Sequence, residues 1–347
     1  KRSYGSGNII ERSPGVFLIR YRDNAGNRHN ETVKGNRKKA EAVLTERRTS
    51  METGTLSGKK KLTVGAYLQS WLETYATTNC TAKTVQGYKQ SINCYTGPIV
   101  GVTLQKLDAT HIQPIYAGMI KRGLSNRTVD ALHKALNIAL NTAVKQGTLK
   151  RNILDSVIAP KVVKKEVEVW DAETRANAMT VLRESQYGDF YQLGLMTGMR
   201  RGELAGLKWA NVNLDNQQLQ VVNTLQRITG QGLMNGQPKT ERSRRSIALS
   251  ADTVALLHEI RGRQITQQLE VSDAWTDSGY VFTDASGMPV DPNLATRAFK
   301  KVVATAGLPK LTIHGLRHTH ATILLEQGVN PKVVSDRLGH ASPATTM

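Results

Sequence analysis

The sequence predicts a multidomain α+β protein with three parts: a small β-sheet covered by a helix, a helical bundle, and a mainly helical domain with a small antiparallel sheet. Its 347 residues exceed the roughly one to two hundred of a single domain. Two polar, charged segments without periodic apolar residues, 56–63 and 161–168, separate parts 1–55, 64–160 and 169–347. The apolar pattern changes from alternating in the first part to helical in the second.

Residues 1–55 predict a two- or three-stranded sheet. The β-branched and aromatic residues of 15–22 indicate a strand, and the turn residues after it begin a hairpin whose second strand covers 28–34. Alternate residues of a strand point to opposite faces, so Arg20 and Arg22 project together from one face. A helix over about 37–52 covers the other face. Such a ribbon fits a DNA groove, although an unliganded hairpin shows the same pattern.

Residues 64–160 predict a bundle of four helices, because apolar residues recur at helical spacing. Ser125 is the expected N-cap of the clearest helix, which ends at Gly147. The other helices are expected over 67–75, 81–95 and 109–122. Outside the apolar stripes, basic side chains are available for phosphate groups: Lys83, Lys89, Lys121, Arg122 and Arg127.

Residues 169–347 combine helical patterns with two short strands. The expected strands lie near 219–222 and 246–249. The expected helices are 172–184, 188–197, 201–207, 251–268, 291–306, 317–328 and 330–338.

The charge indicates a polyanionic partner. The net charge is +19, and basic groups exceed acidic ones in each part: 15 to 6 in residues 1–61, 10 to 4 in 62–160, and 22 to 18 in 161–347. A basic surface spread over several domains favours nucleic acid over one small acidic ligand. The sequence has no membrane-length apolar run and no signal-peptide pattern, so we expect a cytoplasmic protein. Its two cysteines, Cys80 and Cys94, predict neither a disulfide framework nor a metal cage.

Four motifs in the third part bring together groups that bind phosphate or move protons. The segment 197–204 joins two helices and places Arg200 at a helix start, where backbone N–H groups favour an anion. The motif His-Gly-Leu-Arg at 314–317 sets an imidazole and a guanidinium three residues apart, on one side of a helix or its first turn. Lys239 is expected at a hairpin tip, and His340 ends a Leu-Gly-His motif.

These motifs, in this order, resemble those of the tyrosine recombinases, the phage-integrase family, and the likeness extends to integrases of phages and conjugative transposons. The resemblance implies a tyrosine recombinase fold with an arm-type DNA-binding domain at 1–55, a core-binding domain at 64–160 and a catalytic domain at 169–347. It implies a supporting role for Glu203. The catalytic residues that it implies are Arg200, Lys239, His314, Arg317 and His340. The residues expected to contact DNA are Arg20, Arg22, Lys83, Lys89 and Arg127.

The chemistry of phosphodiester cleavage suits these residue types. Guanidinium groups stay charged and grip phosphate oxygens bidentately, which stabilises the charge that develops on them. Lys239 can protonate the departing 5′ oxygen, His314 can manage the proton of the attacking hydroxyl, and His340 can donate a hydrogen bond. A tyrosine nucleophile would conserve the bond energy as a 3′-phosphotyrosine, so the expected reaction uses no cofactor, ATP or metal.

The nucleophile is the point where the sequence departs from the family pattern. The family's tyrosine lies further from the Leu-Gly-His histidine than Met347, which follows His340 by seven residues. We therefore expect the tyrosine to lie beyond Met347, so that this form binds DNA without cleaving it. Two alternatives stay open: a catalytically silent DNA-binding module of the same fold, and a metal-dependent nuclease. The nuclease is disfavoured because no acidic residue lies between His314 and His318.

The resemblance also implies the assembly. Four protomers should gather on double-stranded DNA, with crossover sites bound by the two larger domains and arm sites by residues 1–55, to integrate or excise a mobile element by transposition-like recombination. A protein of this kind is expected at the bacterial nucleoid. The sequence does not specify the DNA target, the element, the favoured direction, or whether an excision factor or a DNA-bending protein takes part.

Overall fold

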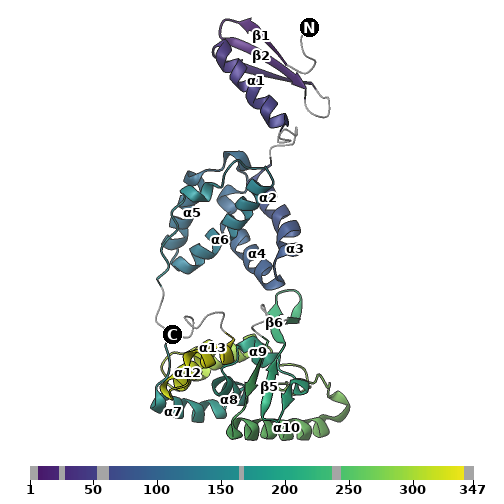
Figure 1. Cartoon of the computed structure of the whole chain (residues 1–347), viewed down its shortest axis with the longest axis vertical. Helices are drawn as coiled ribbons and strands as arrows, with labels where there is room; N and C mark the ends of the chain where they lie inside the picture. Colours follow the sequence, from purple (N-terminus) through teal and green to yellow (C-terminus); the bar gives the residue numbers. More distant parts are fainter. Residues whose placement is uncertain (1–6, 23–27, 53–61, 164–167, 237–243, 340–347) are drawn as a thin grey trace. The chain divides into compact units, whose positions relative to one another are not determined.

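The computed structural model describes residues 7–22, 28–52, 62–163, 168–236 and 244–339. Contacts divide the chain into two compact units, residues 1–163 and 164–347, and each is described by itself (Figure 1). The division falls inside the second predicted linker. Within the described residues, no helix combines the length and the apolar character needed to cross a membrane.

The first unit begins with a three-stranded antiparallel sheet in the order β1-β2-β3 (Figure 1). Its strands are β1 Asn8–Ser13, β2 Val16–Arg22 and β3 Arg28–Lys34, and helix α1 spans Arg37–Glu52. Phe17, Ile19 and Val33 pack against Ala40 and Leu44 of α1, which confirms the predicted sheet face and covering helix. Strand β1 was not predicted, because its two apolar residues are adjacent and show no strand-like alternation.

The rest of the first unit is a helical bundle with a separate hydrophobic core. Its helices are α2 Val64–Trp71, α3 Thr77–Asn79, α4 Ala82–Tyr95, α5 Ala109–Lys121 and α6 Asn126–Lys145. Helix α6 begins as predicted, because the Ser125 hydroxyl accepts a hydrogen bond from the Thr128 backbone N–H. Its buried stripe includes Val129, Leu132 and Leu136. The two cores of this unit are consistent with separate domains, but the predicted domain boundaries stay a prediction.

The second unit is mainly helical and holds two small sheets (Figure 1). Strands β4 Val212–Asn213, β5 Gln218–Val221 and β8 Arg245–Ala248 form one antiparallel sheet, and β6 Thr224–Ile228 pairs with β7 Gly232–Gly236. The helices are α7 Ala172–Arg183, α8 Gly188–Thr197, α9 Arg201–Ala205, α10 Ala251–Val271, α11 Pro292–Thr305, α12 Ile313–Glu326 and α13 Pro331–Leu338.

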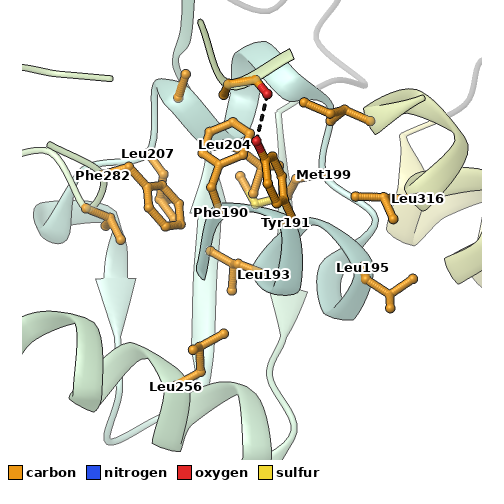
Figure 2. Close-up of a cluster of buried hydrophobic side chains, with 14 of the residues drawn as sticks. Phe190, Tyr191, Leu193, Leu195, Met199, Leu204, Leu207, Leu256, Phe282 and Leu316 are labelled. Atoms are coloured by element: carbon orange, nitrogen blue, oxygen red, sulfur yellow. Dashed lines mark hydrogen bonds between the residues drawn. The ribbon is translucent and has the colours of Figure 1, made fainter. Parts of the chain in front are cut away.

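Helix α8 lies at the centre of this unit, and nearly all of its residues are buried. Phe190, Tyr191 and Leu193 pack into a hydrophobic cluster to which the surrounding helices and Phe282 also contribute side chains (Figure 2). The Tyr191 hydroxyl donates a 2.7 Å hydrogen bond to the Ala295 carbonyl, so its polar end is satisfied inside the core. Because α8 is largely buried, it gives the loop that follows it, 198–200, a rigid base.

Two predictions for this unit need correction. Helix α12 begins at Ile313 rather than at residue 317, because the Thr312 hydroxyl caps it by accepting from the Gly315 N–H at 3.0 Å. His314 and Arg317 therefore both lie in the first turns of the helix. The β6–β7 hairpin was not predicted, although Gly230 in its turn and Gly232 at the start of β7 both have positive φ.

Candidate active site

Two arginines from separate elements contact one buried glutamate in the second unit, and a third arginine lies close enough to be influenced by its charge. Arg200 precedes α9, Arg245 opens β8, and Arg317 lies near the start of α12. The Arg200 Nη1 atom lies 2.7 Å from Glu203 Oε1, and the Arg245 Nη2 atom lies 2.8 Å from Glu203 Oε2. The fold thus brings together three residues that the motifs singled out, Arg200, Glu203 and Arg317, with one that they did not.

Glu203 is a charged carboxylate within the protein. Its side chain is 2% exposed, and it accepts hydrogen bonds from both arginines and from the Arg200 backbone N–H at 2.8 Å. Burial by itself raises the pKa of this carboxyl, but the hydrogen bonds and charge of Arg245, with those of Arg200, outweigh it and lower the pKa to about 2. The backbone N–H at the start of α9, where the sequence analysis placed an anion, is taken by Glu203.

The C-terminal end of α13 organises the arginines. Three successive backbone carbonyls accept one hydrogen bond each: that of Arg337 from Arg245 Nε at 2.6 Å, that of Leu338 from Arg317 Nη2, and that of Gly339 from Arg200 Nη2 at 3.0 Å. The last carbonyls of a helix have no intrahelical partner and carry partial negative charge. They therefore hold three cations side by side that would otherwise repel each other.

Arg317 is the most deeply placed of the three. It is 2% exposed, and its Nη1 donates to the Gly198 carbonyl at 2.7 Å. Burial, with the charge of Arg200, lowers the pKa of Arg317 to about 9, which leaves it protonated at neutral pH. Arg200, at 37% exposure, is the guanidinium that an incoming anion meets first. Gly198 makes this arrangement possible: its φ is +66°, and an added Cβ would lie 2.6 Å from both His320 and Leu338.

His314 is a neutral imidazole beside the arginines. The residue reaches the surface of α12, but part of its ring is covered: the ring packs edge to face on that of His318, with the centroids 4.7 Å apart. Partial burial, followed by the charges of His318, Arg317 and Arg200, lowers the pKa of His314 to about 4. At neutral pH the ring can therefore accept a proton.

His320 lies behind the site. It is 5% exposed, and its Nε2 accepts from Arg337 Nε at 3.2 Å. Burial and the charge of Arg337 lower the pKa of His320 to about 4. The His318 ring thus packs on that of His314, and the His320 ring is bonded to Arg337. Among the described residues, no three His, Cys, Asp or Glu side chains gather as a metal site requires.

Two of the remaining predicted residues, Lys239 and His340, fall outside the described residues. In the first unit, the β2 register pairs Arg20 with Asn30 and Arg22 with Arg28, on the sheet face opposite α1. Both predicted arginines line an open pocket of about 340 Å³ there. Exposed side chains on the bundle complete the predicted set: Lys83, Lys89 and Arg127.

Sequence reasoning missed Arg245 and the part played by the α13 carbonyls. Arg245 sits in a run of basic residues before a strand, and nothing in its spacing separates it from its neighbours. Backbone carbonyls leave no trace in the residue types. The one available signal was Arg245's position at the start of a strand whose next inward residue, Ile247, is fully buried.

The second unit matches a known protein family. The model of the phage integrase family matches residues 173–347, which carry every site residue of the second unit. The chain belongs to the phage integrase family. Its members include tyrosine-type site-specific DNA recombinases, and a XerC-like tyrosine recombinase of Caldanaerobacter subterraneus is 27% identical over 329 residues, covering 89% of this chain and 84% of the relative. The ICEBs1 integrase of Bacillus subtilis is 26% identical, covering 70% and 66%.

Solved integrase structures share the fold. The Tn1549 transposon integrase in complex with transposon right end DNA has a TM-score of 0.69 at 20% identity, covering 82% of this chain and 93% of that one. A lambda integrase tetramer bound to a Holliday junction has a TM-score of 0.62 at 18% identity, covering 100% and 96%. The predicted tyrosine recombinase fold is confirmed.

Proposed function

We propose that this site-specific recombinase cleaves and rejoins DNA through a 3′-phosphotyrosine intermediate, to integrate and excise a mobile element. One observation carries the proposal: Arg200 and Arg317 converge with their guanidinium groups anchored on backbone carbonyls, and one shared carboxylate only partly compensates the charge of the cluster. Such preorganised cations stabilise the charge that develops on phosphate oxygens during phosphoryl transfer.

Each residue has a distinct proposed role. Arg200 meets the scissile phosphate from the solvent side, and Arg317 supplies positive charge from beneath. His314, neutral at pH 7, accepts the proton of the attacking hydroxyl. Lys239 protonates the departing 5′ oxygen and His340 donates a hydrogen bond to the phosphate, as the family resemblance implies.

The described tyrosines of the second unit do not serve as the nucleophile. Tyr191 is fully buried and bonded to Ala295, and the hydroxyl of Tyr280 donates to Asn235 at 2.7 Å. Tyr187 lines a cavity of about 420 Å³ beside α10 and α11, whose lining includes none of the three arginines. No tyrosine occurs among residues 341–347. The nucleophile therefore comes from a segment other than these.

The first unit is proposed to hold the DNA. The sheet face with Arg20 and Arg22 would bind arm sites, and the bundle with Lys83, Lys89 and Arg127 would bind the crossover site together with residues 169–347. Homologous integrases are known in complex with transposon end DNA and as a tetramer on a Holliday junction, which supports a tetramer on DNA for this chain.

A covalent-trapping assay tests the proposal. The 347-residue chain and a form that carries the proposed tyrosine nucleophile are each mixed with nicked duplexes that carry the ends of the host element, then separated on a denaturing gel. We expect a slow band, insensitive to chelator, only for the form that carries the nucleophile. Arg200→Ala and Arg317→Ala should abolish the band while duplex binding in a mobility-shift assay stays nearly intact.

The second candidate, a silent DNA-binding module, is favoured by the lack of a suitable tyrosine among the described residues of the second unit. It predicts no covalent band in either form, with salt-sensitive DNA binding in both. Covalent complexes in the Arg200→Ala or Arg317→Ala chains at the wild-type rate would refute the proposed roles of the arginines.

A further inference from the structure

Arg245 is buried and contacts the same carboxylate as Arg200. Its side chain is 6% exposed, against 37% for Arg200. Its Nη1 and Nη2 atoms lie 3.1 Å and 2.8 Å from the two oxygens of Glu203, while its Nε donates to the Arg337 carbonyl. Arg245 therefore faces the same carboxylate as Arg200 from the interior.

The two arginines compete for one negative charge. Glu203 Oε1 accepts from Arg200 Nη1 at 2.7 Å and from Arg245 Nη1 at 3.1 Å. Without Arg245, Glu203 would form an ion pair with Arg200 alone, and that pair would carry no net charge. With Arg245, the group of three carries one net positive charge, and the exposed guanidinium that presents it is that of Arg200.

We propose that Arg245 is a positioning residue that neutralises Glu203 and thereby leaves the guanidinium of Arg200 available to bind a phosphate group. This inference rests on the proposed function, in which Arg200 meets the scissile phosphate. Arg245 acts through Arg200 and does not touch the phosphate itself.

The geometry explains why an arginine is used. A guanidinium spreads its donors in a planar fork, which lets Arg245 hold both Glu203 oxygens and the Arg337 carbonyl at once. A lysine at this position would keep the charge but could not span the three acceptors. We therefore expect Arg245→Lys to retain most of the phosphate affinity and to lose thermal stability.

The test measures binding of inorganic phosphate to the 347-residue chain. Phosphate replaces chloride at constant ionic strength, and the rise in the thermal unfolding midpoint reports the affinity. Arg200→Ala defines the share of this rise that comes from the site. Arg245→Gln should weaken that share of binding about tenfold, the effect expected from removing one nearby charge at protein-like dielectric.

A double variant separates charge neutralisation from simple structural support. Glu203→Gln combined with Arg245→Gln removes both charges of the buried pair, so Arg200 regains its uncompensated charge and phosphate affinity should return to within a few-fold of wild type. If Arg245 merely braces α13, the double variant should bind as weakly as Arg245→Gln. Equal phosphate affinity in wild type and Arg245→Gln would also overturn the inference.

Arg337→Gln is the matched control. Its side chain joins α13 to the carbonyl of Ala248, the last residue of β8, at 3.0 Å, and among the described contacts none reaches Glu203. It should lower the unfolding midpoint and leave phosphate affinity unchanged. If Arg245→Gln fails to fold, Arg245→Lys decides: phosphate affinity lost to the level of Arg200→Ala would contradict the inference. A wild-type chain without any phosphate-dependent rise would instead contradict the proposed function.

Discussion

Gly198 is the position where one added methyl group should disturb the site most. The residue follows α8 with φ of +66°, a conformation that costs an L residue about 1 kcal/mol. A Cβ would lie 2.6 Å from a ring carbon of buried His320 and 2.6 Å from Leu338, and such overpacking typically costs about 1–3 kcal/mol. Gly198→Ala should therefore destabilise the second unit by about 2–4 kcal/mol, or roughly 4–15 °C in unfolding midpoint.

Gly307→Ala separates the two contributions. Gly307 has φ of +64° in the same unit, but an added Cβ meets no atom within 4 Å. Gly307→Ala should lower the free energy of unfolding by about 1 kcal/mol, which is the backbone contribution alone. Differential scanning calorimetry of the two variants of the 347-residue chain measures the difference. Gly198→Ala should also weaken phosphate binding, because the Gly198 carbonyl holds Arg317. Equal midpoints for the two variants would refute the packing argument.

Three further predictions concern pH, charge and geometry. The folded protein lowers the pKa of His320 to about 4, whereas the unfolded chain keeps it at about 6.5. As pH falls from about 6.5 to 4, the unfolded chain therefore binds a proton that the folded protein does not, and the free energy of unfolding decreases by at most about 3 kcal/mol. Urea unfolding at pH 7 and pH 5 should show a smaller loss in His320→Gln, and equal losses would contradict this assignment. The double variant Arg20→Gln, Arg22→Gln should reduce the slope of log affinity for duplex DNA against log salt concentration by about two. Arg37 pairs with Glu41 on α1, so Arg37→Gln is the control and should change the slope less. Arg317→Lys should abolish covalent trapping, because one ammonium group cannot bond the Gly198 and Leu338 carbonyls at the same time in the geometry of the guanidinium. Trapping at the wild-type rate would show that the two-pronged guanidinium of Arg317 is dispensable.

The helices and the residue types of the site could be predicted because they depend on local patterns. The buried stripe of α6 and its Ser125 cap follow from helical spacing, and Arg200, Glu203 and Arg317 follow from motifs within a few residues. In contrast, the start of α12 was misplaced because the apolar spacing does not reveal that Thr312 caps it.

The links between distant elements could not be predicted. Arg245 reaches Glu203 across 42 residues, and Arg317 reaches Gly198 across 119. These contacts depend on where β8 and α13 pack, which local patterns in the sequence do not reveal. The role of the α13 carbonyls cannot be inferred from side-chain types, because they are backbone groups. They nevertheless fix the relative positions of all three guanidinium groups.

The most direct measurement of the central claim is a crystal structure of the chain grown or soaked with inorganic phosphate. We predict one phosphate at the exposed side of Arg200, with an oxygen at about 2.8 Å from its guanidinium and within reach of Arg317, as charge-assisted hydrogen bonds require. Phosphate bound only at other basic positions, with Arg200 still paired to Glu203 and no anion beside it, would contradict the assignment of this cluster as the phosphate site.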